Sequence, residues 1–499
     1  MKIKMPRYSG VYKAVTVVAA FALMGALVPS GQPRTHTKAS PLIRFGGVAT
    51  PSGERTDYSL FSCQVLGLSP SATCYDPYQM RHAYGVDTLI NAGFNGAGKT
   101  IVIVDAFQSP NMVAELNVFN TFYGLPSLNG LGGPANPALG KFSQIAPDGL
   151  TPFITGNDNM TGWAQEISLD VEWAHAIAPG ANIVLVLAKS NNDDDMLSAT
   201  RYAVDNNLGD IISQSFGENE SCVDPVTLAR QHEVFASATA KHITIFASSG
   251  DDGASIPSCD GSTLVKAVSS PASDALVTAV GGTELRAARY CLTSRGCNPA
   301  ANPAPGTYLS EVVWNEPNIG ASGGGFSVLL GTPAYQQGTL HGGKQRGVPD
   351  VSYSAAVLHG AITYLNIPGV PAGFYLFGGT SAGSPQWSAL LAIADQKAGH
   401  NLGFINRALY TIGQNSAPYA ASFKDITSGD NSVGAPFNIP GFGANPGWDA
   451  STGLGSPTAD QLVNYLLAYV STGDGVAAIA GSQPRGGGKT FPPGHMTPQ

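Results

Sequence analysis

Residues 377–385 read Phe-Gly-Gly-Thr-Ser-Ala-Gly-Ser-Pro and place Ser381 among small residues. The apolar run that follows, residues 387–395, is typical of a buried helix. The first turn of a helix leaves backbone N–H groups unpaired, so a serine at its head should have an exposed side chain beside donors that can bind an oxyanion. The stretch predicts a nucleophile, although a plain Gly/Ser-rich turn before a core helix would fit the same residues.

The composition excludes some classes of function. The chain has 499 residues, 43% of them hydrophobic, which is enough for a sizeable core. Charged residues make up only 12%, about half of the usual ~25%. The net charge is −8 and no basic run occurs among the 26 Lys and Arg residues, so we expect no nucleic-acid partner. A surface with few carboxylates loses little charge in acid, which fits an acidic extracellular setting.

The N-terminus indicates export. Four basic residues in the first 13 positions precede an apolar run at 14–28, as in a signal peptide, which we assign to residues 1–29. The run of about 15 residues is shorter than the ~20 needed to span a bilayer, so we expect a secreted protein without stable membrane association; a retained anchor is the alternative. We assign residues 30–74 to a linker or short pro-segment, 75–475 to the folded domain and 476–499 to a disordered Gly/Pro tail.

Six cysteines fit an oxidising compartment. No CxxC or Cys/His spacing suggests a zinc site. Two pairs are close in sequence and the remaining two cysteines flank an expected helix and strand, although other pairings are possible. The disulfides predicted in this way are Cys63–Cys74, Cys222–Cys259 and Cys291–Cys297.

Apolar runs and amphipathic segments alternate along the middle of the chain. This alternation predicts an α/β fold in which a parallel sheet is covered by helices on both faces, in three layers. Sites in such sheets form at the carboxyl ends of the strands, where Asp105, the segment after Phe216 and Asp251 are expected. Beyond Gly282 the prolines and glycines predict long loops. The expected strands are 100–105, 182–188, 210–216 and 243–249, and the expected helices are 112–122, 163–178, 195–206 and 226–240.

An acidic pair lies on the second of these helices. Glu166 and Asp170 are four residues apart, which puts both carboxylates on one face with Cβ atoms about 5–6 Å apart. Two carboxylates in a poorly solvated site tend to share one proton, and such a pair can act as an acid/base unit. The rest of the helix is largely apolar, so a buried pair requires a reason. A solvated acidic stripe that includes Glu172 is the alternative.

Several short motifs occur together with this pair and with Ser381. In chain order they are Glu-x-x-x-Asp at 166–170, Ala-Pro-Gly-Ala at 178–181, Ser-Ser-Gly-Asp-Asp-Gly at 248–253, Ala-Val-Gly-Gly-Thr at 279–283, Gly-Thr-Ser-Ala-Gly-Ser-Pro at 379–385, Asp-Ile at 425–426 and Gly-Trp-Asp-Ala-Ser-Thr-Gly-Leu-Gly at 447–455. The set resembles the sedolisins, serine-carboxyl peptidases with a subtilisin-like fold, and covers most of the chain in the family's order.

The resemblance implies a role for each matching residue. Ser381 would be the nucleophile, Glu166 its general base and Asp170 the group that holds and tunes Glu166. Asp251 would donate to the oxyanion, for which its carboxyl must be protonated, and the backbone N–H of Ser381 would be the second donor. The expected activity is that of a secreted, monomeric endopeptidase that cleaves protein or peptide substrates in acid, because a glutamate base has an ordinary pKa of about 4.3.

The resemblance also implies one structural Ca²⁺ ion. Asp425 and Asp449 match the carboxylate ligands, and Ile426 and Gly447 would supply backbone carbonyls. A second carbonyl position, a glycine in the family, is Asn445 here. Hard oxygen ligands from loops suit calcium, and two ordinary turn aspartates are the alternative.

Other readings remain open at this stage. Residues 379–383 also fit the nucleophile elbow of esterases, but that fold needs a histidine after the serine, and only His400 and His495 follow. A subtilisin triad needs an early histidine, which His175 does not provide, although Asp105 matches the strand-end place of the triad aspartate. A secreted pseudo-peptidase that only binds peptides is the third alternative. The family's long pro-domain is replaced here by a short polar stretch, which leaves zymogen control open.

Overall fold

The computed structural model has a central sheet of eight strands. The structure describes residues 38–41, 44–45, 59–65, 73–293, 297–340 and 344–471. The strand order is β16-β14-β10-β8-β5-β7-β6, with β21 also paired to β14. All pairs are parallel except β14–β16. The strands are β5 (Thr100–Ala106), β6 (Phe142–Ile145), β7 (Asn182–Ala188), β8 (Ile211–Gln214), β10 (Thr244–Ser248), β14 (Thr278–Ala287), β16 (Tyr308–Val313) and β21 (Val351–Ser354).

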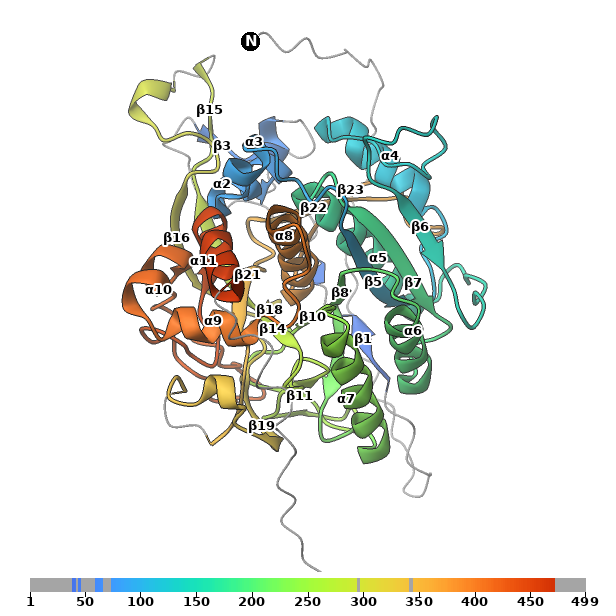
Figure 1. Cartoon of the computed structure of the whole chain (residues 1–499), viewed down its shortest axis with the longest axis vertical. Coiled ribbons are helices and arrows are strands. Elements are labelled where there is room, and N and C mark those ends of the chain that lie inside the picture. Colours follow the sequence, from blue (N-terminus) through green and yellow to red (C-terminus); the bar gives the residue numbers. More distant parts are fainter. Residues whose placement is uncertain are drawn as a thin grey trace, which may run out of the picture. The chain divides into compact units, whose positions relative to one another are not determined.

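Helices pack on both faces of this sheet, as predicted (Figure 1). Strand β5 shows why, because Ile101 and Ile103 belong to one buried cluster whereas Val102 and Val104 belong to another. The first cluster includes residues of α5 and α8, and the second includes residues of α6. The longer helices are α2 (Pro77–Tyr84), α4 (Met112–Tyr123), α5 (Asp158–Ile177), α6 (Asp193–Asp205), α7 (Pro225–Ala240), α8 (Gly383–Ala398), α9 (Asn406–Gly413) and α11 (Ala459–Ser471); α1 (Ser62–Val65), α3 (Val86–Asn91) and α10 (Ser416–Ser422) are shorter.

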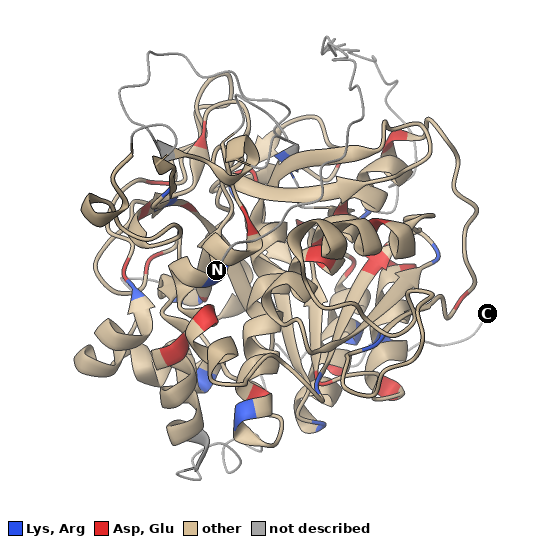
Figure 2. Cartoon of the chain, turned by 90° about the horizontal axis from the view of Figure 1, so that it is seen from above, with Lys and Arg blue, Asp and Glu red and all other residues tan. Residues whose placement is uncertain are grey.

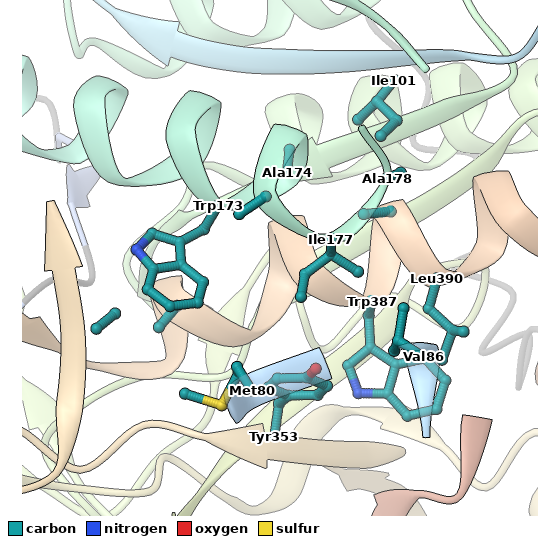
Figure 3. Packing of buried hydrophobic residues seen from close by; sticks show 14 of the residues in the cluster. Met80, Val86, Ile101, Trp173, Ala174, Ile177, Ala178, Tyr353, Trp387 and Leu390 are labelled. Carbon is teal, nitrogen blue, oxygen red and sulfur yellow. The ribbon is translucent and has the colours of Figure 1, made fainter. Parts of the chain in front are cut away.

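Helices α5 and α8 meet in the core. Trp173 and Ile177 of α5 and Trp387 and Leu390 of α8 all belong to the same buried cluster (Figure 3). The indole N–H of Trp173 donates to the main-chain oxygen of Ile362 at 3.1 Å, and a side chain buried this deeply needs such a partner. This packing fixes α5, which carries the predicted acid/base pair, and α8, which directly follows the turn with the predicted nucleophile.

Two smaller sheets border the central one. In the first, β2 (Arg44–Phe45), β23 (Gly373–Gly378), β22 (Gly360–Leu365) and β4 (Cys74–Tyr75) lie side by side. In the second, β9 (Phe216–Asn219) lies between β1 (Ser40–Pro41) and β13 (Ser269–Ser270). Parts of the segment predicted as a linker, residues 30–74, are thus strands paired with the domain. The other strands are β3 (Ser59–Leu60), β11 (Ile256–Pro257), β12 (Leu264–Val265), β15 (Tyr290–Cys291), β17 (Asn315–Glu316), β18 (Gly320–Ala321), β19 (Gly325–Gly331), β20 (Gln345–Val348), β24 (Phe423–Lys424) and β25 (Ser456–Pro457).

Two sequence predictions of secondary structure need correction. The strand expected at 210–216 is two strands, β8 and β9, which separate at Ser215. The region beyond Gly282, expected to be long loops, contains the paired strands β22 and β23. Both errors have the same cause, because strands of four to six residues between glycines and prolines carry too short a pattern to register.

The disulfides and the charge distribution agree with the sequence analysis. Cys63–Cys74, Cys222–Cys259 and Cys291–Cys297 are bonded as predicted. Figure 2 shows the charged residues scattered sparsely over the fold, without a concentration of Lys and Arg. No helix in the described part of the chain is long and apolar enough to cross a membrane. The predicted signal peptide (residues 1–29) and Gly/Pro tail (residues 476–499) lie outside the described residues.

Candidate active site

Helix α5 buries the acidic pair completely. Glu166, Asp170 and Glu172 are all 0% exposed, which excludes a solvated acidic stripe. Glu172 has a separate structural role, since it accepts a hydrogen bond from the backbone N–H of Tyr364 at 2.9 Å. Asn157 begins the helix by accepting a hydrogen bond from the N–H of Met160, as a helix N-cap does. Glu166 and Asp170 are therefore held inside the protein by a well-anchored helix.

A third carboxyl group, Asp105 near the end of β5, is close enough to raise the pKa of both members of the pair. None of the six carboxyl oxygens of Glu166, Asp170 and Asp105 has a hydrogen-bond partner of normal geometry among the described residues. Burial is the main cause that raises the pKa of Glu166 and of Asp170 well above their ordinary values, followed by the neighbouring carboxylates. Burial also raises the pKa of Asp105 to about 8. The cluster therefore favours protonated carboxyls over charged ones.

Ser381 lies in a short 3₁₀ turn, Thr380–Ala382, directly before α8. Its hydroxyl donates to the main-chain oxygen of Ser215 at 3.4 Å, and the Ser215 hydroxyl donates to the main-chain oxygen of Ser381 at 3.5 Å. The Ser381 side chain also lowers the pKa of Glu166, which places it beside that carboxyl, although the two do not form a hydrogen bond of normal geometry. The expectation of an exposed serine is wrong, because Ser381 is 0% exposed among α5, the Ser215 turn and the loop after β10.

Asp251 approaches Ser381 from the loop after β10. Its Oδ1 accepts hydrogen bonds from the N–H and the hydroxyl of Thr380, both at 2.8 Å. Its Oδ2 is buried without a hydrogen-bond partner in the described structure and lies 3.7 Å from Nε of Arg44. Burial raises the pKa of Asp251 to about 6, against the opposing effects of Arg44 and Thr380. A proton on this carboxyl would reside on Oδ2, since both Thr380 bonds occupy Oδ1.

The geometry distinguishes the two adjacent aspartates. Asp251 faces Thr380, the neighbour of Ser381, whereas Oδ1 of Asp252 pairs with Nη2 of Arg44 at 2.7 Å. Sequence reasoning alone did not identify Ser215, Thr380 or Arg44 as part of the site. Ser215 and Thr380 belong to the site through hydrogen bonds to residues distant in sequence, which a single sequence does not reveal. Arg44 lies in a segment that was predicted to be a linker.

No histidine among the described residues takes part in this arrangement. Nε2 of His175 lies 2.8 Å from the main-chain oxygen of Pro126, and burial lowers the pKa of its ring to about 4. No histidine in the described part of the chain contacts Ser381 in a hydrogen bond or ion pair. A Ser-His-Asp triad of the subtilisin or esterase kind thus has no support from these residues.

The five predicted calcium ligands lie in two neighbouring segments. Asp425 accepts hydrogen bonds from the N–H of Gly447 (3.1 Å to each carboxylate oxygen) and from the hydroxyl of Tyr419 (2.9 Å). Asp449 accepts from the N–H groups of Ser451 and Thr452 at 2.8 and 2.9 Å.

The donor set is compatible with calcium. The main-chain oxygens of Ile426, Asn445 and Gly447 accept none of the hydrogen bonds found among the described residues, so three hard acceptors remain beside two carboxylates. No group of three or more His, Cys, Asp or Glu side chains suited to a metal occurs in the described part of the chain. A metal here would therefore depend on backbone carbonyls as much as on side chains.

Comparison with known proteins gives consistent similarities. The profile of the Subtilase family matches residues 153–443. Kumamolisin from Bacillus sp. (strain MN-32) is 31% identical over 464 residues, which cover 88% of this chain and 73% of kumamolisin. Sedolisin from Pseudomonas sp. (strain 101) is 32% identical over 290 residues, covering 56% of this chain and 44% of that protein. Tripeptidyl-peptidase 1 from Rattus norvegicus is 28% identical over 351 residues, which cover 65% of this chain and 56% of that protein. The chain thus spans about three quarters of kumamolisin and about half of the other two.

A solved structure is also similar to this chain in sequence and fold. Pseudomonas sedolisin, described as a serine-carboxyl proteinase complexed with two molecules of pseudo-iodotyrostatin, is 27% identical and superposes with a TM-score of 0.63. The match covers 81% of this chain and 99% of that chain.

The buried carboxyls predict a protein that is more stable in acid. Above about pH 4 an unfolded aspartate has lost its proton, whereas folded Asp105 keeps its proton up to about pH 8. The folded state then binds more protons than the unfolded state, so the free energy of unfolding falls as pH rises between these values, by about 1.4 kcal/mol per pH unit for each such group. Denaturant unfolding at pH 4, 5, 6 and 7 should show this fall, with a shallower slope for Asp105→Asn.

The control for this measurement is Asp194→Asn, which removes a carboxylate whose side chain is 80% exposed. It should leave the slope unchanged. A free energy of unfolding that rises from pH 4 to pH 7, or equal slopes for Asp105→Asn and the parent chain, would contradict the argument.

Proposed function

The chain belongs to the sedolisin family of serine-carboxyl peptidases, with its subtilisin-like fold, and from this premise we propose that it is a secreted serine endopeptidase that hydrolyses peptide bonds of protein substrates in acid. The observation that supports the proposal best is the convergence of Glu166, Asp251 and Ser381 at one edge of the sheet. Each comes from a different segment of the chain, and Asp170 and Asp105 are close enough to Glu166 to raise its pKa. All four catalytic residue types are present and buried together, which does not favour a pseudo-peptidase.

In the proposed reaction, Oγ of Ser381 attacks the carbonyl carbon of the substrate while Glu166 takes the hydroxyl proton as general base. Asp170 remains protonated beside Glu166 and limits the repulsion between the two carboxyls. Glu166 then gives the proton to the leaving amine, and the acyl-enzyme forms. A water molecule repeats the sequence in the second half and releases the acid product.

The oxyanion of each tetrahedral intermediate would be bound by the protonated Oδ2 of Asp251 and by the backbone N–H of Ser381. Preorganised donors of this kind stabilise charge that develops in the transition state. Thr380 holds Oδ1 of Asp251 with two hydrogen bonds, so the carboxyl can rotate little and Oδ2 is the atom left to donate. This role requires acid, because ionised Asp251 has no proton to donate.

The setting of the enzyme follows from several features. Three disulfides join all six cysteines, which fits an extracellular compartment. The basic and apolar N-terminus supports export through a signal peptide. We propose that the enzyme acts as a monomer on protein and peptide substrates.

We further propose one structural calcium ion, held by the carboxylates of Asp425 and Asp449 and by the main-chain oxygens of Ile426, Asn445 and Gly447. These residues fit the ion because they offer only hard oxygen donors from loops. The ion would neutralise Asp425 and Asp449 and join the segment after β24 to the segment before β25. It would take no part in the reaction.

The activity itself is tested with a denatured protein substrate from acid to mild alkali, at about pH 3–9. We expect cleavage in acid, and a loss of at least about 1,000-fold in kcat/KM for Ser381→Ala and of about 100-fold or more for Glu166→Gln. Activity that peaks in mild alkali would contradict the mechanism. Substrate binding without cleavage at any pH would instead indicate a pseudo-peptidase.

Asp251 predicts the upper pH limit of the activity. Burial raises its pKa to about 6, so Asp251 should lose the proton that it donates to the oxyanion as pH rises through about 6. We therefore expect kcat/KM to fall above about pH 6. Asn keeps an N–H donor at every pH, so Asp251→Asn should extend activity toward neutral pH, whereas Asp251→Ala should lose about 100-fold at all pH values. An unchanged upper limit in Asp251→Asn would contradict this role.

Calcium binding predicts a metal-dependent melting temperature. A ligand at about 100 times its dissociation constant adds about 2.7 kcal/mol to the free energy of unfolding, which corresponds to a rise of about 3 °C in the melting temperature of a domain of this size. Chelation should remove this rise, and Asp425→Asn should make the melting temperature insensitive to added calcium. Magnesium serves as the control ion. Equal melting temperatures with calcium and with chelator in the parent chain would contradict the proposed calcium site.

A further inference from the structure

A cavity of about 460 Å³ lies beside Asp251 and is lined by the β9 strand, the loop after β10 and the N-terminal segment. Its charges separate by origin. The charged lining residues from the β9 strand and the loop after β10 are all acidic: Glu218, Asp251, Asp252 and Asp260. The two basic lining residues, Lys38 and Arg44, both come from the N-terminal segment. Without the N-terminal segment the lining of this cavity would carry only acidic groups. Such a cavity attracts a cationic side chain.

The N-terminal segment is bound along both sides of Ser381. In β1, Pro41 pairs antiparallel with Phe216 of β9, which begins one residue after Ser215. In β2, Arg44 pairs antiparallel with Gly378 at the end of β23, three residues before Ser381. The chain therefore runs with its earlier residues on β9 and its later residues on β23.

A substrate peptide can add to the same two strand edges, because main-chain pairing of this kind does not depend on sequence. If it runs in the same direction, its N-terminal part pairs with β9 and its C-terminal part with β23. The scissile bond then faces Ser381 between the two parts. The residue that takes the position of Arg44 belongs to the leaving-group side.

Arg44 shows how a side chain at this position is recognised. Its Nη2 lies 2.7 Å from Oδ1 of Asp252, a charge-assisted contact, while its Nε lies 3.7 Å from Oδ2 of Asp251. The two partners of the shorter contact are about one third exposed, at 31% for Arg44 and 32% for Asp252. Asp251 must be neutral to serve as an oxyanion donor, so recognition of positive charge falls to Asp252.

We propose that Asp252 is a specificity-determining residue, whose carboxylate binds a basic side chain of the substrate on the C-terminal side of the scissile bond, in the subsite that Arg44 occupies in this structure. The inference rests on the proposed peptidase function and deepens it by naming a substrate class. The ordinary explanation is that Arg44 and Asp252 form a surface ion pair that only secures the N-terminal segment, and such pairs contribute little. The experiment distinguishes the two.

Three peptide sets, one for each position, test the proposal with the full-length chain. Each set has a fixed sequence on the N-terminal side and carries Arg, Lys, Gln or Glu at one of the first three positions after the scissile bond. We expect kcat/KM to be about tenfold higher for Arg than for Gln at one of these positions, the factor for a hydrogen-bonded charge pair that remains partly solvated. Asp252→Asn should reduce this ratio to about twofold or less, and kcat/KM for the Gln peptide should change little.

Asp260→Asn is the matched control, because it removes an aspartate from the lining of the same cavity without touching Arg44. Hydrogen bonds from Ser258 and Ser262 lower the pKa of Asp260 to about 2, so this carboxylate is charged in acid. It should keep most of the Arg preference. An equal loss in both variants would show a general effect of negative charge and would overturn the assignment to Asp252.

Binding separates this inference from the proposed function. In a Ser381→Ala background, fluorescent Arg peptides should bind about tenfold tighter than Gln peptides, and Arg44→Gln should increase that affinity by freeing the subsite. If no peptide is cleaved but this preference persists, the peptidase proposal fails and the subsite stands. If peptides are cleaved with equal kcat/KM for Arg and Gln at all three positions, the subsite fails and the peptidase stands.

Discussion

The structure depends on the burial of carboxyl groups that have no partners of opposite charge. Glu166, Asp170 and Asp105 are all 0% exposed, and their oxygens lack hydrogen bonds of normal geometry among the described residues. A charged carboxylate in such a place would cost several kcal/mol, so burial favours a proton on each group, and Glu166 is the one member that the proposed reaction requires to be ionised. The fold can hold them because α5 and α8 pack tightly through Trp173, Ile177, Trp387 and Leu390. Acid is therefore the condition in which this core is least strained electrostatically.

The same constraint connects stability to chemistry. A general base must be able to lose its proton, and an oxyanion donor must keep its own. In the proposed site Glu166 has other carboxyls as neighbours, whereas Asp251 has Thr380 and Arg44. Burial raises the pKa of Glu166 well above its ordinary value and that of Asp251 to about 6, so the shift supports the donor role of Asp251, whereas the base role of Glu166 rests on its place beside Ser381. Ser381 is beside Glu166, it follows Thr380, which bonds Asp251, and its hydroxyl donates to the main-chain oxygen of Ser215.

Local patterns predicted much of this arrangement. Apolar runs predicted strands of the central sheet and helices that cover it, and the four-residue spacing of Glu166 and Asp170 predicted that both lie on one helix face. Contacts between distant segments were not predictable in this way. Arg44 and Asp252 are 208 residues apart in sequence, and Thr380 and Asp251 are 129 residues apart. The burial of Ser381 was also missed, because a turn rich in small residues indicates nothing about what packs over it.

The N-terminal segment changes the electrostatics of the site that it covers. The guanidinium of Arg44 lies near Oδ2 of Asp251 and lowers the pKa of that carboxyl, which favours the ionised form. An ionised Asp251 cannot donate to an oxyanion, so in the proposed mechanism Arg44 would oppose catalysis by charge as well as by position. When Arg44 is displaced, Asp251 loses its nearest cation and the effect of burial on its pKa becomes stronger. A basic side chain of a substrate would approach the same place, but Asp252 would hold its charge through the shorter of the two contacts that Arg44 makes here. Under the two proposals, Asp251 would donate a proton and Asp252 would bind a positive charge. A single carboxyl could not do both, because one task requires a proton and the other a negative charge.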